Sequence, residues 1–183
     1  MQPQIRRSQP ADFDAIFDTV SEAFQEPDSE VKEHVRLVKH LLADPTAKPY
    51  LSLVAVADEH VVGFILFTSV HINNSQKQVS ASILAPIAVR PFCQNKGIGR
   101  LLIKKDIERL KTMDVELLFV LGPPGYYPKF GFLPAGAAGF TAPYPIPGEN
   151  EQAWMVQALR PGIIQNISGK VNCADTLDDP SYW

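Results

Sequence analysis

Seven consecutive residues near the middle of the chain, 94–100, have the types and spacing of a phosphate-binding loop. The loop follows an apolar stretch typical of a strand and opens a segment with helical periodicity. The first turn of a helix has backbone N–H groups without helical acceptors, and the helix dipole favours an anion there. Gly97 and Gly99 would let a ligand approach the main chain closely. The spacing therefore predicts a site for a phosphate or pyrophosphate.

Familiar nucleotide-binding patterns fit this loop poorly. A P-loop would end in Gly-Lys-Ser or Gly-Lys-Thr, and no such ending is present. A dinucleotide fingerprint would start at Gly97 and Gly99, but its third position is Leu102 and it does not lie in an opening βαβ unit. The glycines could also serve only a tight turn. The loop alone leaves these alternatives open.

A second group of chemically capable side chains is aromatic. Residues 126–132 read Tyr-Tyr-Pro-Lys-Phe-Gly-Phe. A phenol can donate a proton to a leaving group, so Tyr127 is a candidate acid, with Tyr126 as the adjacent alternative. Both tyrosines could equally be packing residues in a cluster with Phe130 and Phe132.

Periodicity along the chain predicts the elements that must position these residues. Two amphipathic helices follow an opening strand, and the second ends before Asp44-Pro45. The order predicts an α+β fold with a central mixed, twisted sheet, in which an antiparallel meander and a parallel strand pair are flanked by helices. The predicted strands are 4–7, 51–57, 61–70, 78–89, 115–121 and 154–159, and the predicted helices are 13–24, 31–42, 97–113 and a short one at 126–130.

Composition narrows the functional class. The chain has 183 residues, 45% hydrophobic and 20% charged, as expected for one globular domain. A net charge of −3 argues against a nucleic-acid or anionic-membrane partner. We see no signal peptide and no apolar run that could span a bilayer, so we expect a cytoplasmic protein. Cys93 and Cys173 lack Cys-x-x-Cys spacing, so neither a metal site nor a disulfide framework is predicted.

Together, these motifs resemble those of the GNAT superfamily of acetyl-CoA-dependent N-acetyltransferases, and most closely a bacterial subgroup of predicted acetyltransferases. The resemblance rests on a strand ending Pro-Ile-Ala-Val, on Gln-Asn-Lys-Gly-Ile-Gly, and on Tyr-Tyr-Pro-Lys-Phe-Gly-Phe. It is strong over residues 80–135 and weak over the tail. It implies a single GNAT-like domain at residues 1–160, with residues 161–183 as a tail that packs on or extends it. It also implies acetyl-CoA as the cofactor, without a metal.

The resemblance assigns roles to individual residues. In the family, the strand before the loop offers backbone groups to the pantetheine arm of coenzyme A, and a proline there suits a bulge or an opened strand pair. The loop amides would hold the pyrophosphate, and Tyr127 would give a proton to the departing thiolate. The implied cofactor-binding residues are Ile87, Ala88, Val89, Gln94, Asn95, Lys96, Gly97, Ile98, Gly99, Arg100 and Tyr126, and the implied catalytic residue is Tyr127.

Two departures from the family leave the base and the acceptor unassigned. The strand at 78–89 has no Asp, Glu or His, although a carboxylate there often serves as the general base. No Asn occurs between 115 and 127, where many members use one to hold the pantetheine. Family acceptors usually enter near residues 24–30 and 139–154, so a small amine, a polyamine and a protein amine stay open. The remaining candidate bases are Glu22, Glu26, Asp28, Glu30 and, with less support, His71.

The predicted reaction is direct attack of a primary amine on the thioester, without a covalent enzyme intermediate. A non-catalytic acyl-CoA-binding sensor or interaction module is the alternative, because the usual base is missing. A nucleotide-dependent enzyme is a weaker alternative. The predicted partner is a small-molecule or peptide amine, not nucleic acid or membrane, and both a monomer and a homodimer fit the sequence.

Overall fold

The longest strand, β3 (His60–Asn73), organises the fold. It pairs antiparallel with β2 (Leu51–Ala57) through a tight turn and with β4 (Ala81–Val89) along its other edge. Asp58 and Glu59 form that turn with positive φ, as a two-residue hairpin requires.

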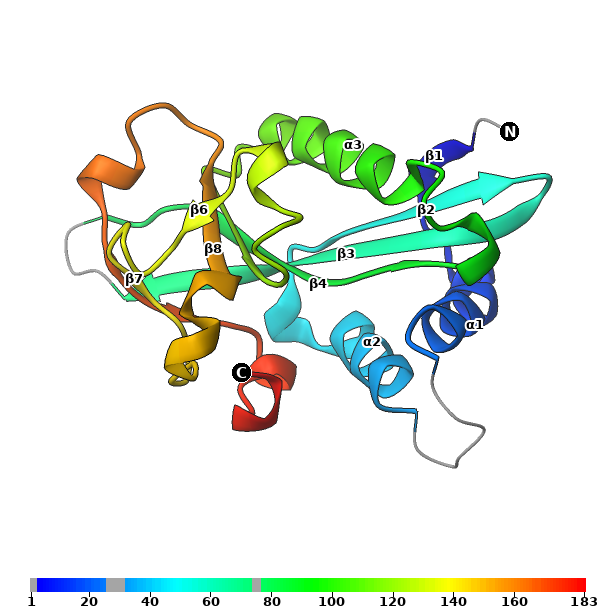
Figure 1. The fold of residues 1–183 in the computed structure, drawn as a ribbon, viewed down its shortest axis with the longest axis horizontal. Helices are drawn as coiled ribbons and strands as arrows, with labels where there is room; N and C mark the ends of the chain where they lie inside the picture. The colour runs from blue at the N-terminus through cyan, green and yellow to red at the C-terminus, as the bar shows by residue number, and fades with distance from the viewer. Residues whose placement is uncertain (1–2, 26–31, 74–76) are drawn as a thin grey trace.

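The computed structural model, shown in Figure 1, describes residues 3–25, 32–73 and 77–183.

The remaining strands extend this meander into a mixed sheet. The order across the sheet is β1-β2-β3-β4-β5-β8-β6, in which β4 and β5 run parallel and the other neighbours run antiparallel. At one end of β3, β9 pairs with both β3 and β7. The predicted single domain, with its meander and parallel pair, is confirmed. The bounds are β1 (Gln4–Arg7), β5 (Leu117–Leu121), β6 (Leu133–Pro134), β7 (Phe140–Thr141), β8 (Trp154–Ala158) and β9 (Gly169–Asn172).

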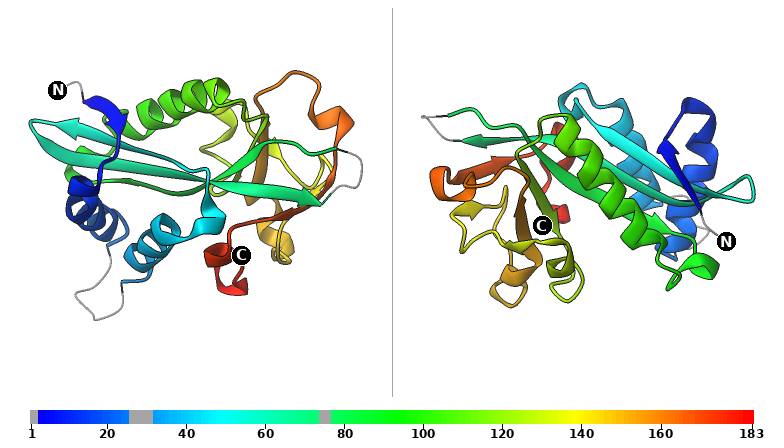
Figure 2. Two further views of the ribbon diagram at one scale, coloured as in Figure 1. Left: turned by 180° about the vertical axis from the view of Figure 1, so that it is seen from behind. Right: turned by 90° about the horizontal axis from the view of Figure 1, so that it is seen from above.

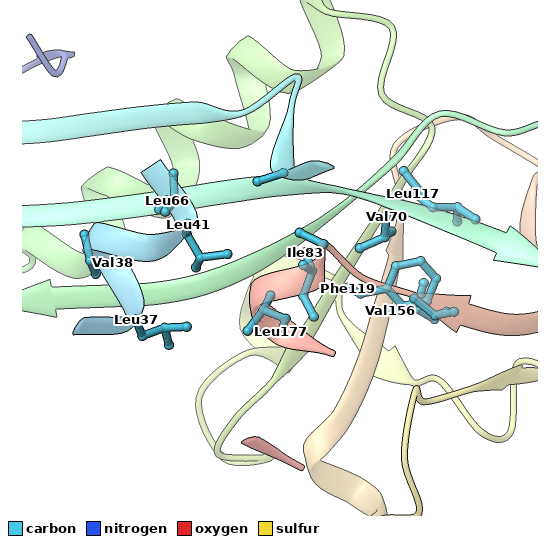
Figure 3. Close-up of a cluster of buried hydrophobic side chains, with 14 of the residues drawn as sticks. Leu37, Val38, Leu41, Leu66, Val70, Ile83, Leu117, Phe119, Val156 and Leu177 are labelled. Carbon is cyan, nitrogen blue, oxygen red and sulfur yellow. The ribbon is translucent and has the colours of Figure 1, made fainter. Parts of the chain in front are cut away.

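Helices cover both faces of the sheet. α1 (Phe13–Ala23) and α2 (Glu33–Ala43) lie on one face, and α3 (Ile98–Thr112) lies on the other (Figures 1 and 2). Each face has its own cluster of buried side chains, which we call the α2-side cluster and the α3-side cluster. Figure 3 shows part of the α2-side cluster. The apolar periodicity thus predicted the three helices close to their observed ends.

The N-terminal end of α3 packs closely on the sheet because Gly63 of β3 has no side chain. A Cβ at Gly63 would lie 3.1 Å from side-chain atoms of both Ile98 and Leu102. The buried stripe of α3 also includes Asp106, whose carboxylate oxygens have no hydrogen-bond partner among the described residues. This packing fixes the loop before α3 over β3 and β4.

Short segments differ from their predicted structure. β4 begins at Ala81 rather than at 78, and β5 begins at Leu117 rather than at 115. Residues 126–130 are not a full helix, and only the 3-10 turn η4 (Pro128–Phe130) forms. The stretch 136–150, for which no helix or strand was predicted, contains β7 and the start of the 3-10 helix η5 (Gly148–Ala153).

The tail has regular structure that its weak pattern did not predict. After β9 it forms two 3-10 turns, η7 (Asp175–Leu177) and η8 (Pro180–Tyr182). The buried carboxylate of Asp44, at the end of α2, accepts hydrogen bonds from the N–H and hydroxyl of Thr176 at 2.9 and 2.7 Å. We keep residues 1–160 and 161–183 as a proposed division, with the tail packed on the same domain.

Candidate active site

A bulge in β4 reverses the direction of its side chains. Between the positions that pair with Leu84 and Ile87, β3 has one residue, whereas β4 has two, Ala85 and Pro86. Such an extra residue shifts the alternation of faces. Ile83 therefore packs in the α2-side cluster, but Ile87 packs against the α3-side cluster. The bulge predicted at Pro86 is confirmed.

The parallel strands β4 and β5 separate at this bulge. Their pairing ends at Leu84 and Val120. Beyond it, Ile87 and its neighbours still pair with β3, but none of the described strands pairs with their other edge. The opened strand pair predicted from the sequence is therefore present.

The free edge of β4 consists of main-chain groups from alternate residues. The N–H of Arg90 donates to the carbonyl of Val62 at 3.0 Å, which makes these two residues a hydrogen-bonded pair. Hydrogen-bonded and non-bonded pairs alternate along antiparallel strands. Ala88 therefore directs its N–H and C=O toward β3, whereas Ile87 and Val89 direct theirs into the opening. Of the three residues predicted to bind the pantetheine arm, Ile87 has both main-chain groups available and Val89 has its N–H, whereas the Val89 carbonyl accepts from the Gln94 side chain.

The loop before α3 presents a run of unpaired amides. Among the described residues, no carbonyl and no side chain accepts a hydrogen bond from the N–H groups of residues 95–100. Asn95 and Gly97 have φ of 58° and 83°, and left-handed residues of this kind make successive N–H groups converge on one point. The side-chain amide of Gln94 donates to the carbonyl of Val89 at 3.0 Å and ties the loop to β4. The loop has the geometry of an anion site.

Tyr126 places a hydroxyl beside this anion site. A Cβ at Gly99 would lie 3.0 Å from Oη of Tyr126, so the absence of a side chain makes room for the phenol. Lys96 and Arg100 are exposed, where they can add positive charge. The side chain of Ile98 is buried instead, so only its main chain can contact a ligand.

Tyr127 is buried in the wall of the opening and is only 4% exposed. Its ring packs edge-on against Tyr126 and Phe132, with ring centroids 5.2 and 5.7 Å apart. Burial, and secondarily the neighbouring Tyr126, raises the pKa of Tyr127, so the phenol keeps its proton at neutral pH. No described residue hydrogen-bonds to its hydroxyl, which leaves that group available to a ligand.

A cavity of about 530 Å³ lies in the opening between β4 and β5. Gln94 and Gly99 lie at its anion-binding end. Its walls come from both faces of the sheet, since Tyr127 belongs to the α3-side cluster and Leu37 and Leu177 belong to the α2-side cluster. The cavity therefore passes through the sheet, and its size suits a small-molecule site.

The far end of the cavity differs from the acceptor region expected from the sequence. Phe24 lines it as expected, but no residue in the range 139–154 does. The tail takes this place, with Leu177, Tyr182 and Trp183 in the cavity wall. In the sequence, only the apolar and aromatic character of these three residues could have indicated that they line a cavity, because the tail lacks a clear periodicity.

The candidate bases named from the sequence do not gather at the cavity in the part of the chain that the structure describes. The carboxylate of Glu22 forms an ion pair with Arg90 at 2.7 Å and does not line the cavity. His71 lines a different cavity, near the other end of β3. Glu26, Asp28 and Glu30 lie outside the described residues.

His34 of α2 was not singled out in the sequence, yet it lines the cavity. Its ring stacks on that of Phe24, with centroids 3.8 Å apart and an interplanar angle of 7°. No glycine-bearing loop and no motif flanks His34 in the sequence. Only its position on the side of α2 that faces the cavity identifies it as a candidate functional residue. The structure thus puts an imidazole and the phenol of Tyr127 on one cavity.

The described residues contain neither a metal-binding cluster nor a helix that could span a membrane. Within residues 3–25, 32–73 and 77–183, no three His, Cys, Asp or Glu side chains gather as a metal site would require. Cys93 and Cys173 are not joined in a disulfide. In the same ranges, every helix is too short or too polar to cross a bilayer.

Comparisons with known proteins agree with this geometry. A family model of the acetyltransferase (GNAT) domain matches residues 4–135. The chain is 44% identical over 140 residues to the uncharacterized N-acetyltransferase YjhQ of Escherichia coli (strain K12), covering 76% of this chain and 77% of that protein. Its fold is similar to that of the GNAT family N-acetyltransferase YhbS from Escherichia coli, solved in complex with CoA. The TM-score is 0.84 at 24% identity, over 98% of this chain and 93% of that one. A GNAT family acetyltransferase from Brucella melitensis, solved in complex with acetyl-CoA, gives a TM-score of 0.73 at 26% identity, over 97% and 99% of the two chains.

Proposed function

We propose that this chain, which belongs to the acetyltransferase (GNAT) family, transfers an acetyl group from acetyl-CoA to a primary amine. One observation carries the proposal: a single cavity joins the unpaired amides before α3, the free edge of β4 and the hydroxyl-bearing ring of Tyr127. These are the three parts that a thioester of coenzyme A would need. A cytoplasmic location and the lack of a nucleic-acid partner stay our predictions from the sequence.

The site fits coenzyme A along its length. The amides of residues 95–100 would hold the pyrophosphate at the N-terminus of α3. The amide groups of the pantetheine arm can pair with the free edge at Ile87 and Val89, as an added strand would. The relatives solved with CoA and with acetyl-CoA support this assignment. The Asn that many members use on the next strand is absent, and Gly122 and Pro123 line the cavity there instead.

Two groups would stabilise charge during the transfer. The N–H of Val89 points into the opening and can donate to the carbonyl oxygen as it gains negative charge. The hydroxyl of Tyr127 can donate to the sulfur as the carbon–sulfur bond breaks. A thiol has a pKa of about 8.5, below the raised pKa of Tyr127, so the hydrogen bond contributes more than complete proton transfer.

The attacking amine must lose a proton, because an alkylammonium has a pKa of about 10.4. We assign this proton to His34, the one imidazole among the described residues that line the cavity. An imidazole is a common general base near neutral pH. The balance is one carbon–nitrogen bond formed and one carbon–sulfur bond broken. Of the two protons that the ammonium loses, one passes to His34 before the attack, and the second ends on the departing sulfur, which leaves as the thiol of coenzyme A.

A thiol-release assay with acetyl-CoA and a panel of amines tests the proposal. Tyr127→Phe should lower kcat by about 10- to 100-fold, in the range for a lost acid, and leave the acetyl-CoA Kd nearly unchanged. Tyr50→Phe is the matched control, since no described residue hydrogen-bonds to the Tyr50 hydroxyl. Unchanged kcat in Tyr127→Phe would remove the proposed role of the phenol.

His34→Gln should lower kcat, whereas His40→Gln, on the exposed side of the same helix, should leave kcat unchanged. The ion pair that engages Glu22, and the lack of a carboxylate on β4, favour one alternative: a non-catalytic acyl-CoA-binding module. Tight acetyl-CoA binding without thiol release for any amine would support that alternative.

A further inference from the structure

We infer that the acceptor is an amine carried on an aromatic or branched aliphatic body that has no second positive charge. This inference rests on the proposed acetyl transfer and names the substrate class of the same site. It concerns the end of the cavity opposite the amides before α3. The residues of this acceptor end are Phe24, His34, Leu37, Leu177, Tyr182 and Trp183.

The acceptor end is apolar. Leu37 and Leu177 belong to the α2-side cluster, and Tyr182 and Trp183 pack against it. Figure 3 shows Leu37 on α2 and Leu177 on the tail within this part of the core. Burying an apolar body against such a wall is favourable, by about 25 cal/mol for each Å² removed from water.

The wall is held in place by contacts within the tail and with the core. The indole N–H of Trp183 donates to the carbonyl of Leu177 at 3.0 Å, which ties the two ends of the tail wall together. Its ring packs edge-on against Trp154, with centroids 5.6 Å apart. The bonds from Thr176 to Asp44 anchor η7 to the end of α2. A preformed wall of this kind favours acceptors whose shape matches it.

The described side chains that line the cavity offer no carboxylate to a second ammonium group. None of the described residues that line it is an Asp or Glu. The tail residues Asp178 and Asp179 do not line the cavity: Asp178 accepts from the Tyr144 hydroxyl at 3.0 Å, and Asp179 accepts from the N–H of Ser181 at 2.8 Å. A polyamine or an aminoglycoside would bury further positive charges against described side chains that include no carboxylate, which is costly. An amine with a single nitrogen brings no second charge into the cavity.

The test compares kcat/KM of the full chain for two matched sets of amines with saturating acetyl-CoA. One set is 2-phenylethylamine, tryptamine and isoamylamine, and the other is spermidine, kanamycin and a lysine-containing peptide. We expect the best apolar amine to exceed the best polycation by about tenfold or more, which corresponds to about 1.4 kcal/mol. A polycation or the peptide as the best substrate would overturn the inference while leaving the proposed transfer intact.

Variants locate the effect at the acceptor end. Leu177→Ala should raise KM for the apolar amines severalfold without changing the acetyl-CoA Kd, whereas Leu133→Ala, an exposed leucine outside the cavity, should change neither. Tyr182→Glu, at a half-buried position, is the second variant, and it should reduce the preference for apolar amines over polycations. Unchanged preference in both variants would contradict the inference. Loss of acetyl-CoA binding in the unmodified chain would instead contradict the proposed function itself.

Discussion

A Cβ placed on Gly122 would lie 2.5 Å from Cε2 of Tyr127, so the phenol ring occupies the space that any other side chain at 122 would fill. Gly122 directly follows β5, at the point where β5 has left its parallel partner β4. The ring of Phe132 packs edge-on against the same phenol. Tyr127 is therefore held between the end of β5 and the turn after it, with its hydroxyl free to serve a ligand.

Gly122→Ala should displace the Tyr127 ring and lower kcat by about 10- to 100-fold, because a shift of about 1 Å at a reacting group has effects of this size. The acetyl-CoA Kd should change less than kcat, since the amides before α3 are untouched. Steady-state kinetics and calorimetry measure the two quantities. Gly125→Ala is the control, because a Cβ there would meet no atom within 4 Å. Equal kcat values for both variants would show that the ring position does not matter.

Gly97→Ala should weaken acetyl-CoA binding by about tenfold. Gly97 has φ of 83°, and a left-handed alanine costs about 1–2 kcal/mol, so the loop would relax away from the conformation that directs its amides to one point. Calorimetry with acetyl-CoA measures this change. A Cβ at Gly97 would meet no atom within 4 Å, so a steric clash cannot account for the loss. Wild-type affinity in Gly97→Ala would count against the anion site.

Asp44→Asn should lower the free energy of unfolding at pH 7 by about 2 kcal/mol and loosen η7. Burial alone would raise the pKa of Asp44, but hydrogen bonds from Thr46 and Thr176 outweigh it and lower the pKa from 3.8 to about 2. A depressed pKa stabilises the fold above the unfolded value, and this contribution fades as pH falls from about 4 toward 2. Urea unfolding across this range measures it. The exposed Asp18→Asn is the control, and an identical acid profile in both variants would refute the assignment.

Asp106→Leu should stabilise the protein at pH 7 by about 1–3 kcal/mol, as expected when a buried polar group without a hydrogen-bond partner becomes apolar. Burial raises the pKa of Asp106 well above its ordinary value, although Arg109 acts in the opposite direction. The folded state therefore keeps a proton that the unfolded state loses, so this group lowers stability as pH rises above about 4. Unfolding midpoints at several pH values test this, with the exposed Glu108→Leu as control. A destabilised Asp106→Leu at pH 7 would contradict it.

The sequence was sufficient for the parts of the site that depend on the main chain. Pro86 predicted the bulge and the opened pair, because a proline cannot donate to a strand ladder. The glycines of the loop predicted the amide-rich start of α3, because they permit its backbone conformation. Regular apolar periodicity gave the three helices and most strands, since burial on one face imposes that period.

Residues brought together from distant segments were not predictable from local pattern. His34 has no motif around it, and its role depends on how α2 lies over the opening between β4 and β5. The tail wall depends on Thr176 reaching Asp44 and on Trp183 reaching Trp154, contacts between segments far apart in the chain. Asp106 is an exception to the apolar periodicity. Its helical spacing places a carboxyl group in a buried stripe of α3 that is otherwise apolar.

The central claim is that main-chain amides at the start of α3 and the free edge of β4 hold the acetyl donor. Amide hydrogen exchange with and without saturating CoA measures this directly. The account predicts slowed exchange at residues 95–100 and at Ile87 and Val89, with little change in the cavity lined by His71. Unchanged exchange at the loop and at β4 in the presence of saturating CoA would contradict the account.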